Sequence, residues 1–169
     1  NVYMVPGATI SISSAADGNG KGQRAVGIKN DTKPLTVDEA LDLTVTAATA
    51  ATLQGINMTI IATGVSNNAG DLTLGQAGAA NTITVNADAG TYTGAETGSS
   101  KASATGIVPG FASLTISGAT TLNVSAQGMT PGAGSDVIIA EAVANGIKQE
   151  DPGFTSDPIK LGGLTGTIS

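Results

Sequence analysis

The sequence of 169 residues contains no cysteine and no histidine. Without cysteine the chain has no disulfide and no thiolate nucleophile. Without histidine it lacks the most common general base and a frequent ligand of transition metals. Serine–histidine, cysteine–histidine and zinc–histidine chemistries are therefore excluded.

Aromatic residues make up only 2% of the chain, and no apolar run approaches the length of about 18 residues that a membrane-spanning helix needs. The formal net charge is −6. An acidic chain is a poor partner for nucleic acid or for an anionic membrane surface, because both attract basic faces. We therefore expect no nucleic-acid partner and no membrane span.

Two pairs of adjacent carboxylates, Asp38/Glu39 and Glu150/Asp151, raise the possibility of glycosidase-like acid and base catalysis. Adjacent residues of a strand point to opposite faces, so neither pair can serve one cleft alone. The scarcity of aromatic side chains also leaves little surface on which a sugar could stack. We expect that the protein is not an enzyme.

The segment Asp17–Gly22 begins like a calcium-binding loop, with Asp and Asn at alternating positions. Lys21 then occupies a position that should donate oxygen, and Ile28 stands where the closing glutamate belongs. An ordinary loop is the better interpretation, and the sequence predicts neither a metal nor a cofactor.

What the chain does contain is 24 glycines and short alternating blocks of Ile, Val and Leu bounded by Gly, Asn and Pro. Such blocks are typical of strands. The dipeptide Asn145-Gly146, between two apolar segments, is a strong hairpin signal. The sequence predicts a single all-β domain, an antiparallel β-sandwich of the Ig-like or jelly-roll-like kind.

A repeat supports this interpretation. Leu72–Leu74 followed by Thr82–Ala87 resembles Leu114–Ser117 followed by Thr121–Ala126 in residue type. We interpret the two copies as two similar hairpins, because a solenoid requires at least three units.

The first dozen residues alternate, with apolar residues or Pro at every even position from Val2 to Ile12. A terminal strand with one apolar face can leave its own sheet and enter that of another subunit. The sequence also starts at Asn1 rather than at Met, which predicts removal of a signal peptide and an extracellular or cell-surface location. We therefore divide the chain into a donor strand, residues 1–13, and a sandwich domain, residues 14–169.

With this terminal strand and a Thr-, Ala- and Gly-rich body, the chain resembles exported fibre subunits such as those of chaperone-usher pili and some archaeal pili and threads. The resemblance implies a homopolymeric filament for adhesion or biofilm formation, in which each donor strand fills a groove of the neighbouring subunit. The residues that would enter the groove are Val2, Met4, Ala8, Ile10 and Ile12. The chain departs from many chaperone-usher pilins in lacking their disulfide, and it has neither a C-terminal sortase sorting signal nor the long apolar N-terminal helix of type IV pilins.

Two alternatives stay open. Residues 2–13 can be the first strand of the chain's own sandwich, and the protein can be an Ig-like binding module of a surface layer, adhesin or phage particle that does not polymerise. The module would bind through loops at residues 64–70 and 89–101. Three sequons match the N-glycosylation pattern, and the first, in a predicted loop, is the best candidate; they are at Asn30, Asn57 and Asn123.

Overall fold

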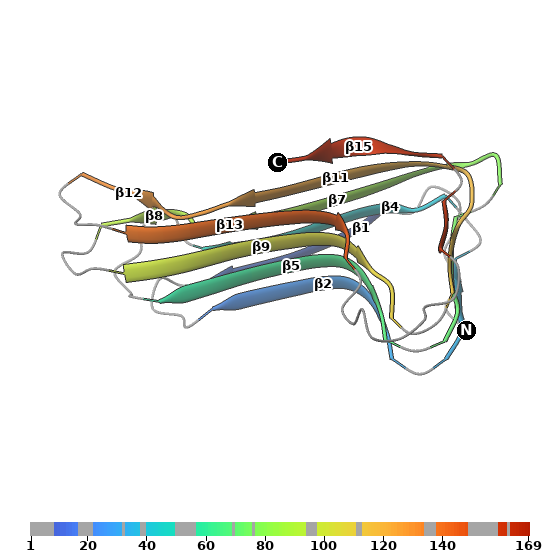
Figure 1. Cartoon of the computed structure of the whole chain (residues 1–169), viewed down its shortest axis with the longest axis horizontal. Coiled ribbons are helices and arrows are strands. Elements are labelled where there is room, and N and C mark those ends of the chain that lie inside the picture. Colours follow the sequence, from blue (N-terminus) through green and yellow to red (C-terminus); the bar gives the residue numbers. More distant parts are fainter. Residues whose placement is uncertain are drawn as a thin grey trace.

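The computed structural model describes residues 9–16, 22–31, 33–37, 40–49, 57–68, 70–75, 77–93, 98–110, 113–133, 138–148, 159–161 and 163–169. In this part of the chain the regular structure is entirely β-strand, and every strand pairing is parallel. Three main sheets and one short pair result (Figure 1).

Sheet A consists, in spatial order, of β1 (Thr9–Ala16), β4 (Asp42–Thr49), β7 (Ala80–Asp88), β11 (Ala119–Gln127) and β15 (Leu164–Ile168). Sheet B consists of β2 (Gln23–Asn30), β5 (Met58–Asn67), β9 (Gly98–Val108) and β13 (Ile138–Ile147). Sheet C consists of β3 (Leu35–Val37), β6 (Leu72–Leu74), β10 (Leu114–Ile116) and β14 (Ile159–Leu161), and β8 (Thr91–Tyr92) pairs with β12 (Thr130–Pro131).

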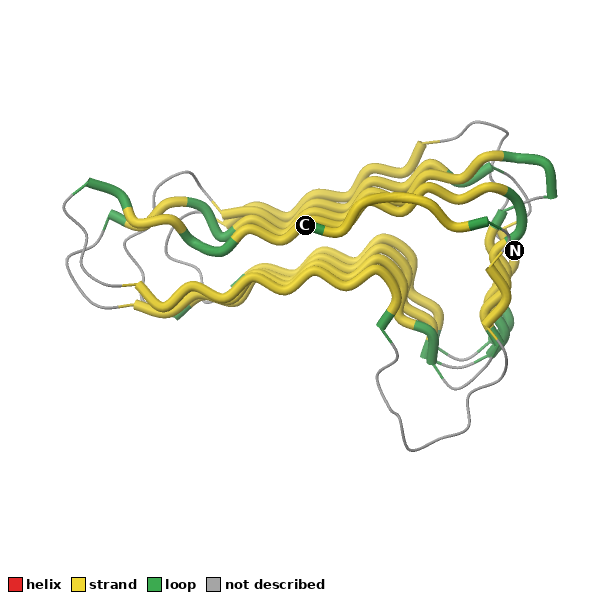
Figure 2. The backbone as a smooth tube through the Cα atoms, turned by 45° about the horizontal axis from the view of Figure 1, so that its top comes forward, coloured by secondary structure: helices red, strands yellow, loops and turns green. Residues whose placement is uncertain are grey.

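The chain visits sheets A, B and C in turn and then returns to sheet A one strand further along. Each circuit is one coil, and the coils stack with their strands in register. Figure 2 shows sheets A and B as two facing layers, with sheet C running across one end. This architecture is a parallel β-solenoid.

The prediction of an antiparallel Ig-like or jelly-roll-like sandwich is therefore wrong. The repeated segments are not hairpins: the first parts of the two copies form β6 and β10 and the second parts lie in β7 and β11, and β6 pairs with β10, and β7 with β11, in parallel ladders. Asn145-Gly146 lies inside β13 rather than at a turn. Alternating apolar residues fix which face of a strand is buried, but they carry no information about the direction of the neighbouring strand.

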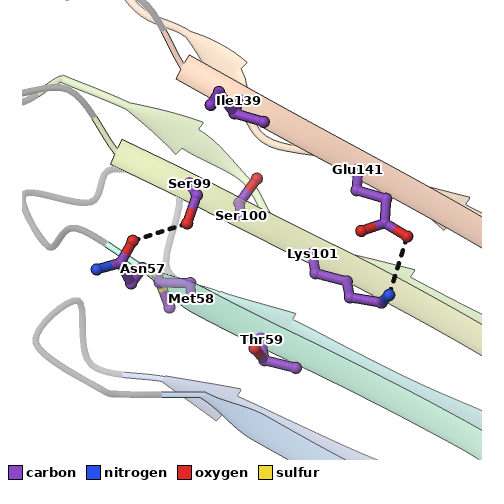
Figure 3. A pocket seen from close by; sticks show the side chains of 8 residues that line it. All are labelled: Asn57, Met58, Thr59, Ser99, Ser100, Lys101, Ile139 and Glu141. Carbon is purple, nitrogen blue, oxygen red and sulfur yellow. Dashed lines mark hydrogen bonds and ion pairs between the residues drawn. The ribbon is translucent and has the colours of Figure 1, made fainter.

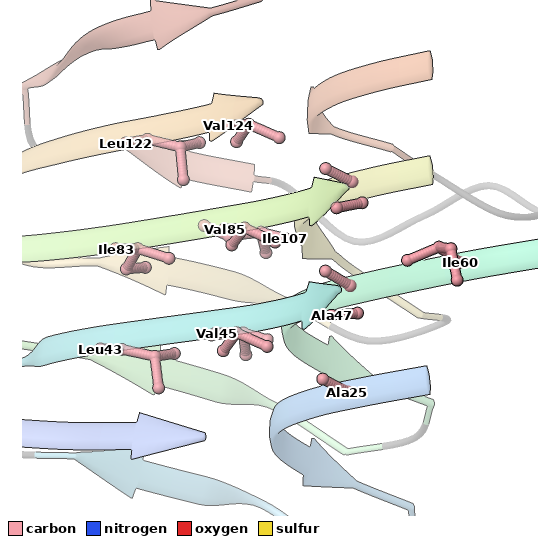
Figure 4. Close-up of a cluster of buried hydrophobic side chains, with 14 of the residues drawn as sticks. Ala25, Leu43, Val45, Ala47, Ile60, Ile83, Val85, Ile107, Leu122 and Val124 are labelled. Atoms are coloured by element: carbon pink, nitrogen blue, oxygen red, sulfur yellow. The ribbon is translucent and has the colours of Figure 1, made fainter. Parts of the chain in front are cut away.

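The core between sheets A and B is built from rows of like residues, one from each coil. One row of sheet A runs Ile10, Leu43, Ile83 and Leu122, and the next runs Ile12, Val45, Val85, Val124 and Ile168. Figure 4 shows the buried members of these rows, stacked above one another. Full burial of each large side chain contributes about 1.5–3 kcal/mol to folding.

A row of glycines in sheet B faces the largest of these side chains: Gly27, Gly64, Gly106 and Gly146. A Cβ atom at Gly106 would lie 2.6 Å from Cδ1 of Leu122, and one at Gly64 would lie 2.9 Å from Cγ2 of Val85. These distances are shorter than van der Waals contact. Glycine is therefore required here so that the two sheets can approach each other.

Asn81 ties three successive coils together. Its side chain is buried, with 2% exposed, and its Oδ1 accepts a hydrogen bond from the backbone N–H of Leu41 at 3.1 Å. Its Nδ2 donates to the carbonyl of Ser117 at 2.9 Å and to the hydroxyl of Thr120 at 3.1 Å. The Asn81 amide thus forms hydrogen bonds with polar groups of both the preceding and the following coil.

We expect Gly106→Val to lower the free energy of unfolding by about 1–3 kcal/mol, because the new side chain would overpack the space that Leu122 fills. Ser103→Val, an outward position of the same strand between Ile61 and Val143, is the matched control. Urea denaturation measures both changes. Equal stability of the two variants would contradict the packing role of the glycine row.

We expect Asn81→Ala to cost at least about 2 kcal/mol, because the N–H of Leu41 and the carbonyl of Ser117 would stay buried without these partners. Asn86→Ala, in the same strand, is the control. The Asn86 side chain lies on the outer face, where its Oδ1 accepts a hydrogen bond from the Ser125 hydroxyl at 2.6 Å. The denaturation midpoint should fall much further for the first variant. A larger loss at Asn86 would show that Asn81 is not the clamp between coils.

Candidate functional site

The two end coils of the solenoid carry open sheet edges. Within the described residues, β1, β2 and β3 each pair on one side only, and so do β13, β14 and β15 at the other end. We call the first group the first coil and the second group the last coil, in which β15 begins a further circuit, so that sheet A has five described strands and sheets B and C have four. Edge strands present unpaired backbone N–H and C=O groups, which are a template for another strand.

Ile168 marks the open end of the last coil. It occupies the same row as Val85 and Val124, which are at most 2% exposed, yet 59% of its own surface is accessible. Its Cδ1 lies 2.9 Å from the Cβ position of Gly146, so the side chain points inward toward sheet B. Ile168 is therefore a core residue with no described coil above it.

The first coil ends the same rows at the opposite edge. Ile10 and Ile12 are partly buried and pack against the core, and they pair with Leu43 and Val45 of β4. The other proposed donor residues, Val2, Met4 and Ala8, lie outside the described residues. The proposed boundary between residues 13 and 14 falls inside β1.

For Ile10 and Ile12 the structure thus shows a strand in parallel register with the chain's own sheet. The acceptor groove that we expected belonged to an incomplete antiparallel sandwich, and that fold is not the one observed. A role for these two residues in polymerisation stays a prediction, but they would now act from the edge strand β1 of sheet A and not from a free donor strand.

The three sequons lie in different surroundings. Asn30 ends β2 and donates through Nδ2 to Oδ1 of Asn67 at 2.7 Å, in a partly buried pair. Asn57 is exposed, has a φ of 72° and accepts a hydrogen bond from the Ser99 hydroxyl at 2.7 Å. Asn123 is half-buried on the outer face of β11. Asn57, rather than the Asn30 favoured from sequence, is the most accessible of the three.

Charged residues at the two ends form local pairs. Nζ of Lys29 lies 2.8 Å from Oδ2 of Asp31, and this hydrogen bond lowers the pKa of the Asp31 carboxyl. In β9 and β13, Nζ of Lys101 lies 2.9 Å from Oε1 of Glu141. Both pairs are about half exposed, and neither holds a buried charge that could do chemistry.

A shallow hollow of about 190 Å³ lies where β5, β9 and β13 begin (Figure 3). The polar groups around it bond to each other: Ser99 donates to Asn57, and Lys101 pairs with Glu141. Its volume is below the roughly 300 Å³ at which small-molecule pockets begin. Nothing in this arrangement provides a catalytic or ligand-binding constellation.

The other candidates for chemistry lie mostly outside the described residues. This applies to both carboxylate pairs and to residues 17–21 of the calcium-like loop. Among the residues that the structure does describe, no cluster of three or more acidic side chains could hold a metal ion, and no helix is long and apolar enough to cross a membrane.

Comparison of the chain with protein-family models, with curated proteins and with solved structures finds no match. The candidate site is therefore defined by geometry alone. Two features distinguish it: open edges at both ends, and core rows that run in register from one edge to the other.

Proposed function

We propose that the protein is a structural subunit of an extracellular filament, and that the filament lengthens by stacking the first coil of one copy on the last coil of the next. The supporting observation is the continuity of the rows between the two edges. Insertion of a donor strand into a groove is replaced here by addition of a whole coil.

The rows of the two end coils correspond position by position. In sheet A, Ile12 of an added copy would continue the row that ends at Ile168. In sheet B, Gly27 and Ala25 belong to the same rows as Gly146 and Ala144, but β2 of the added copy would lie one strand position beyond β13, because sheet A has one more described strand than sheet B. The contact between the two copies would thus be made by the pairing of β1 with β15 in sheet A, where apolar residues of the same row meet.

The energy of such a contact comes from several modest terms. Covering Ile168 and Ile12 would contribute about 1.5–3 kcal/mol for each side chain that becomes fully buried. Each new backbone hydrogen bond adds about 0.5–1.5 kcal/mol. The cost of ordering two bodies opposes these gains, so the balance at the contact between β1 and β15 decides whether filaments form.

The second candidate is a module of a surface layer, adhesin or phage particle that does not polymerise. One observation favours it: sheet A has a regular polar outer face, which plays no part in coil stacking. In that case the open edges would be covered by other β-coils.

Ile168→Asp should abolish filament growth, because it places a charge in the row that the next coil must cover. The matched control is Ile139→Asp, since Ile139 is also exposed, at 68%, but lies in an outward row with Asn57 and Ser99. Sedimentation velocity at increasing concentration and negative-stain microscopy measure the outcome. Circular dichroism checks that both variants keep their strands.

At the other edge, Ile12→Asp should have the same effect as Ile168→Asp, and the outward Ser13→Asp should have little effect. Wild-type protein that remains monomeric at every concentration would contradict filament formation by stacking. Filaments that survive Ile168→Asp and Ile12→Asp would show that they assemble through some other surface.

A further inference from the structure

Much of the outer face of sheet A is a regular array of small polar side chains. Besides a mixed outward row, Ala15–Ala48–Asp88–Gln127, three outward rows run across the sheet from β1 to residues 165–169. Every position in them except Asp42 is Thr, Ser or Asn. The rows are Thr9–Asp42–Thr82–Thr121–Thr165, Ser11–Thr44–Thr84–Asn123–Thr167 and Ser13–Thr46–Asn86–Ser125–Ser169. We call this array the threonine face.

The outer face of sheet B provides a comparison within the same molecule. Its rows combine charged, apolar and small residues, as in the row of Thr59, Lys101 and Glu141 and the row of Arg24, Ile61, Ser103 and Val143. Threonine is favoured in strands in general, but that preference applies to both sheets. The uniformity of these three rows therefore needs a reason of its own.

Three hydroxyls in the middle of the threonine face have no hydrogen-bond partner among the described residues. The side-chain hydrogen bonds of this face run from Thr9 to Asp42, from Ser125 to Asn86, from Thr167 to Asn123 and from Thr165 to the backbone carbonyl of Thr120. The hydroxyls of Thr44, Thr84 and Thr121 bond to no other described residue and face solvent. They are available to bind water or a ligand.

The face is also flat and periodic. Successive coils follow nearly the same path in Figure 2, so that the array has little twist. Neighbouring strands of a sheet lie about 4.8 Å apart, and outward residues of one strand repeat every 6.6–6.8 Å or so. The coils differ in length, because fewer residues separate Thr9 from its partner Asp42 than separate Asp42 from its partner Thr82. The outward residues of the three rows nevertheless stay aligned from strand to strand.

We propose that the threonine face binds ice. Its two repeat distances are close to those between oxygen atoms on a prism face of an ice crystal, so that a row of hydroxyls can take lattice positions while the methyl groups order the water between them. The rows carry one ionised side chain, Asp42, in a chain whose net charge is −6. An almost uncharged face suits an uncharged crystal.

Other ligands fit this face less well. Proteins usually bind a polysaccharide surface by stacking aromatic side chains on its sugar rings, and the threonine face contains no aromatic residue. Nucleic acid requires a basic face, and an apolar protein interface requires large side chains. The inference goes beyond the proposed filament and does not depend on it, because the threonine face and the open edges are separate surfaces.

The test is to measure ice shaping, thermal hysteresis and inhibition of ice recrystallisation for three proteins. The wild type should be active, and Thr84→Lys, at the centre of the array, should lose the activity. Ser103→Lys adds the same charge at an outward position of sheet B and should keep it. Circular dichroism and melting curves establish that both variants are folded.

An inactive wild type would overturn the proposal, and so would equal activity in the two lysine variants. Binding to cellulose or chitin without any effect on ice would also overturn it and indicate a polysaccharide ligand. Ile12→Asp separates the two proposals, because it blocks stacking at the edge but leaves the outward rows intact. That variant should still shape ice even if it forms no filaments.

Discussion

The structure depends on how closely sheets A and B approach each other. Leucine and isoleucine in sheet A meet glycine in sheet B at every coil, as at Leu122 and Gly106. This thin core explains how a chain with only 2% aromatic residues can bury its interior. It also holds the coils in phase, because a coil shifted by one residue would bring a side chain against Leu122 in place of glycine.

The strands and their buried faces could be predicted from the sequence, but their pairing could not. Thr82–Ala87 and Thr121–Ala126 are strands, and their alternation gives the correct inward residues, such as Ile83 and Leu122. Parallel and antiparallel neighbours bury the same alternating face. Interpreting two similar segments as hairpins rather than as stacked coils therefore gave the wrong architecture.

Glycine was the signal that could have corrected this interpretation. Gly64, Gly106 and Gly146 look like turn residues in the sequence, but each lies within a long strand and at the same row. Sequence reasoning also missed Asn81 as a link between coils, since a single asparagine has no periodic pattern. For the candidate site, the apolar face of Ile10 and Ile12 was visible, whereas its position at an open edge follows only from the stacking.

The link made by Asn81 has a mechanical consequence. A coil that touches only its neighbours can peel away alone, so a solenoid pulled along its axis tends to unravel from its ends. Asn81 bonds to the carbonyl of Ser117 and the N–H of Leu41 at the same time, so separating one of these middle coils from its neighbours also breaks hydrogen bonds of the Asn81 side chain. Under tension the outer coils should therefore detach at a lower force than the coils that Asn81 links.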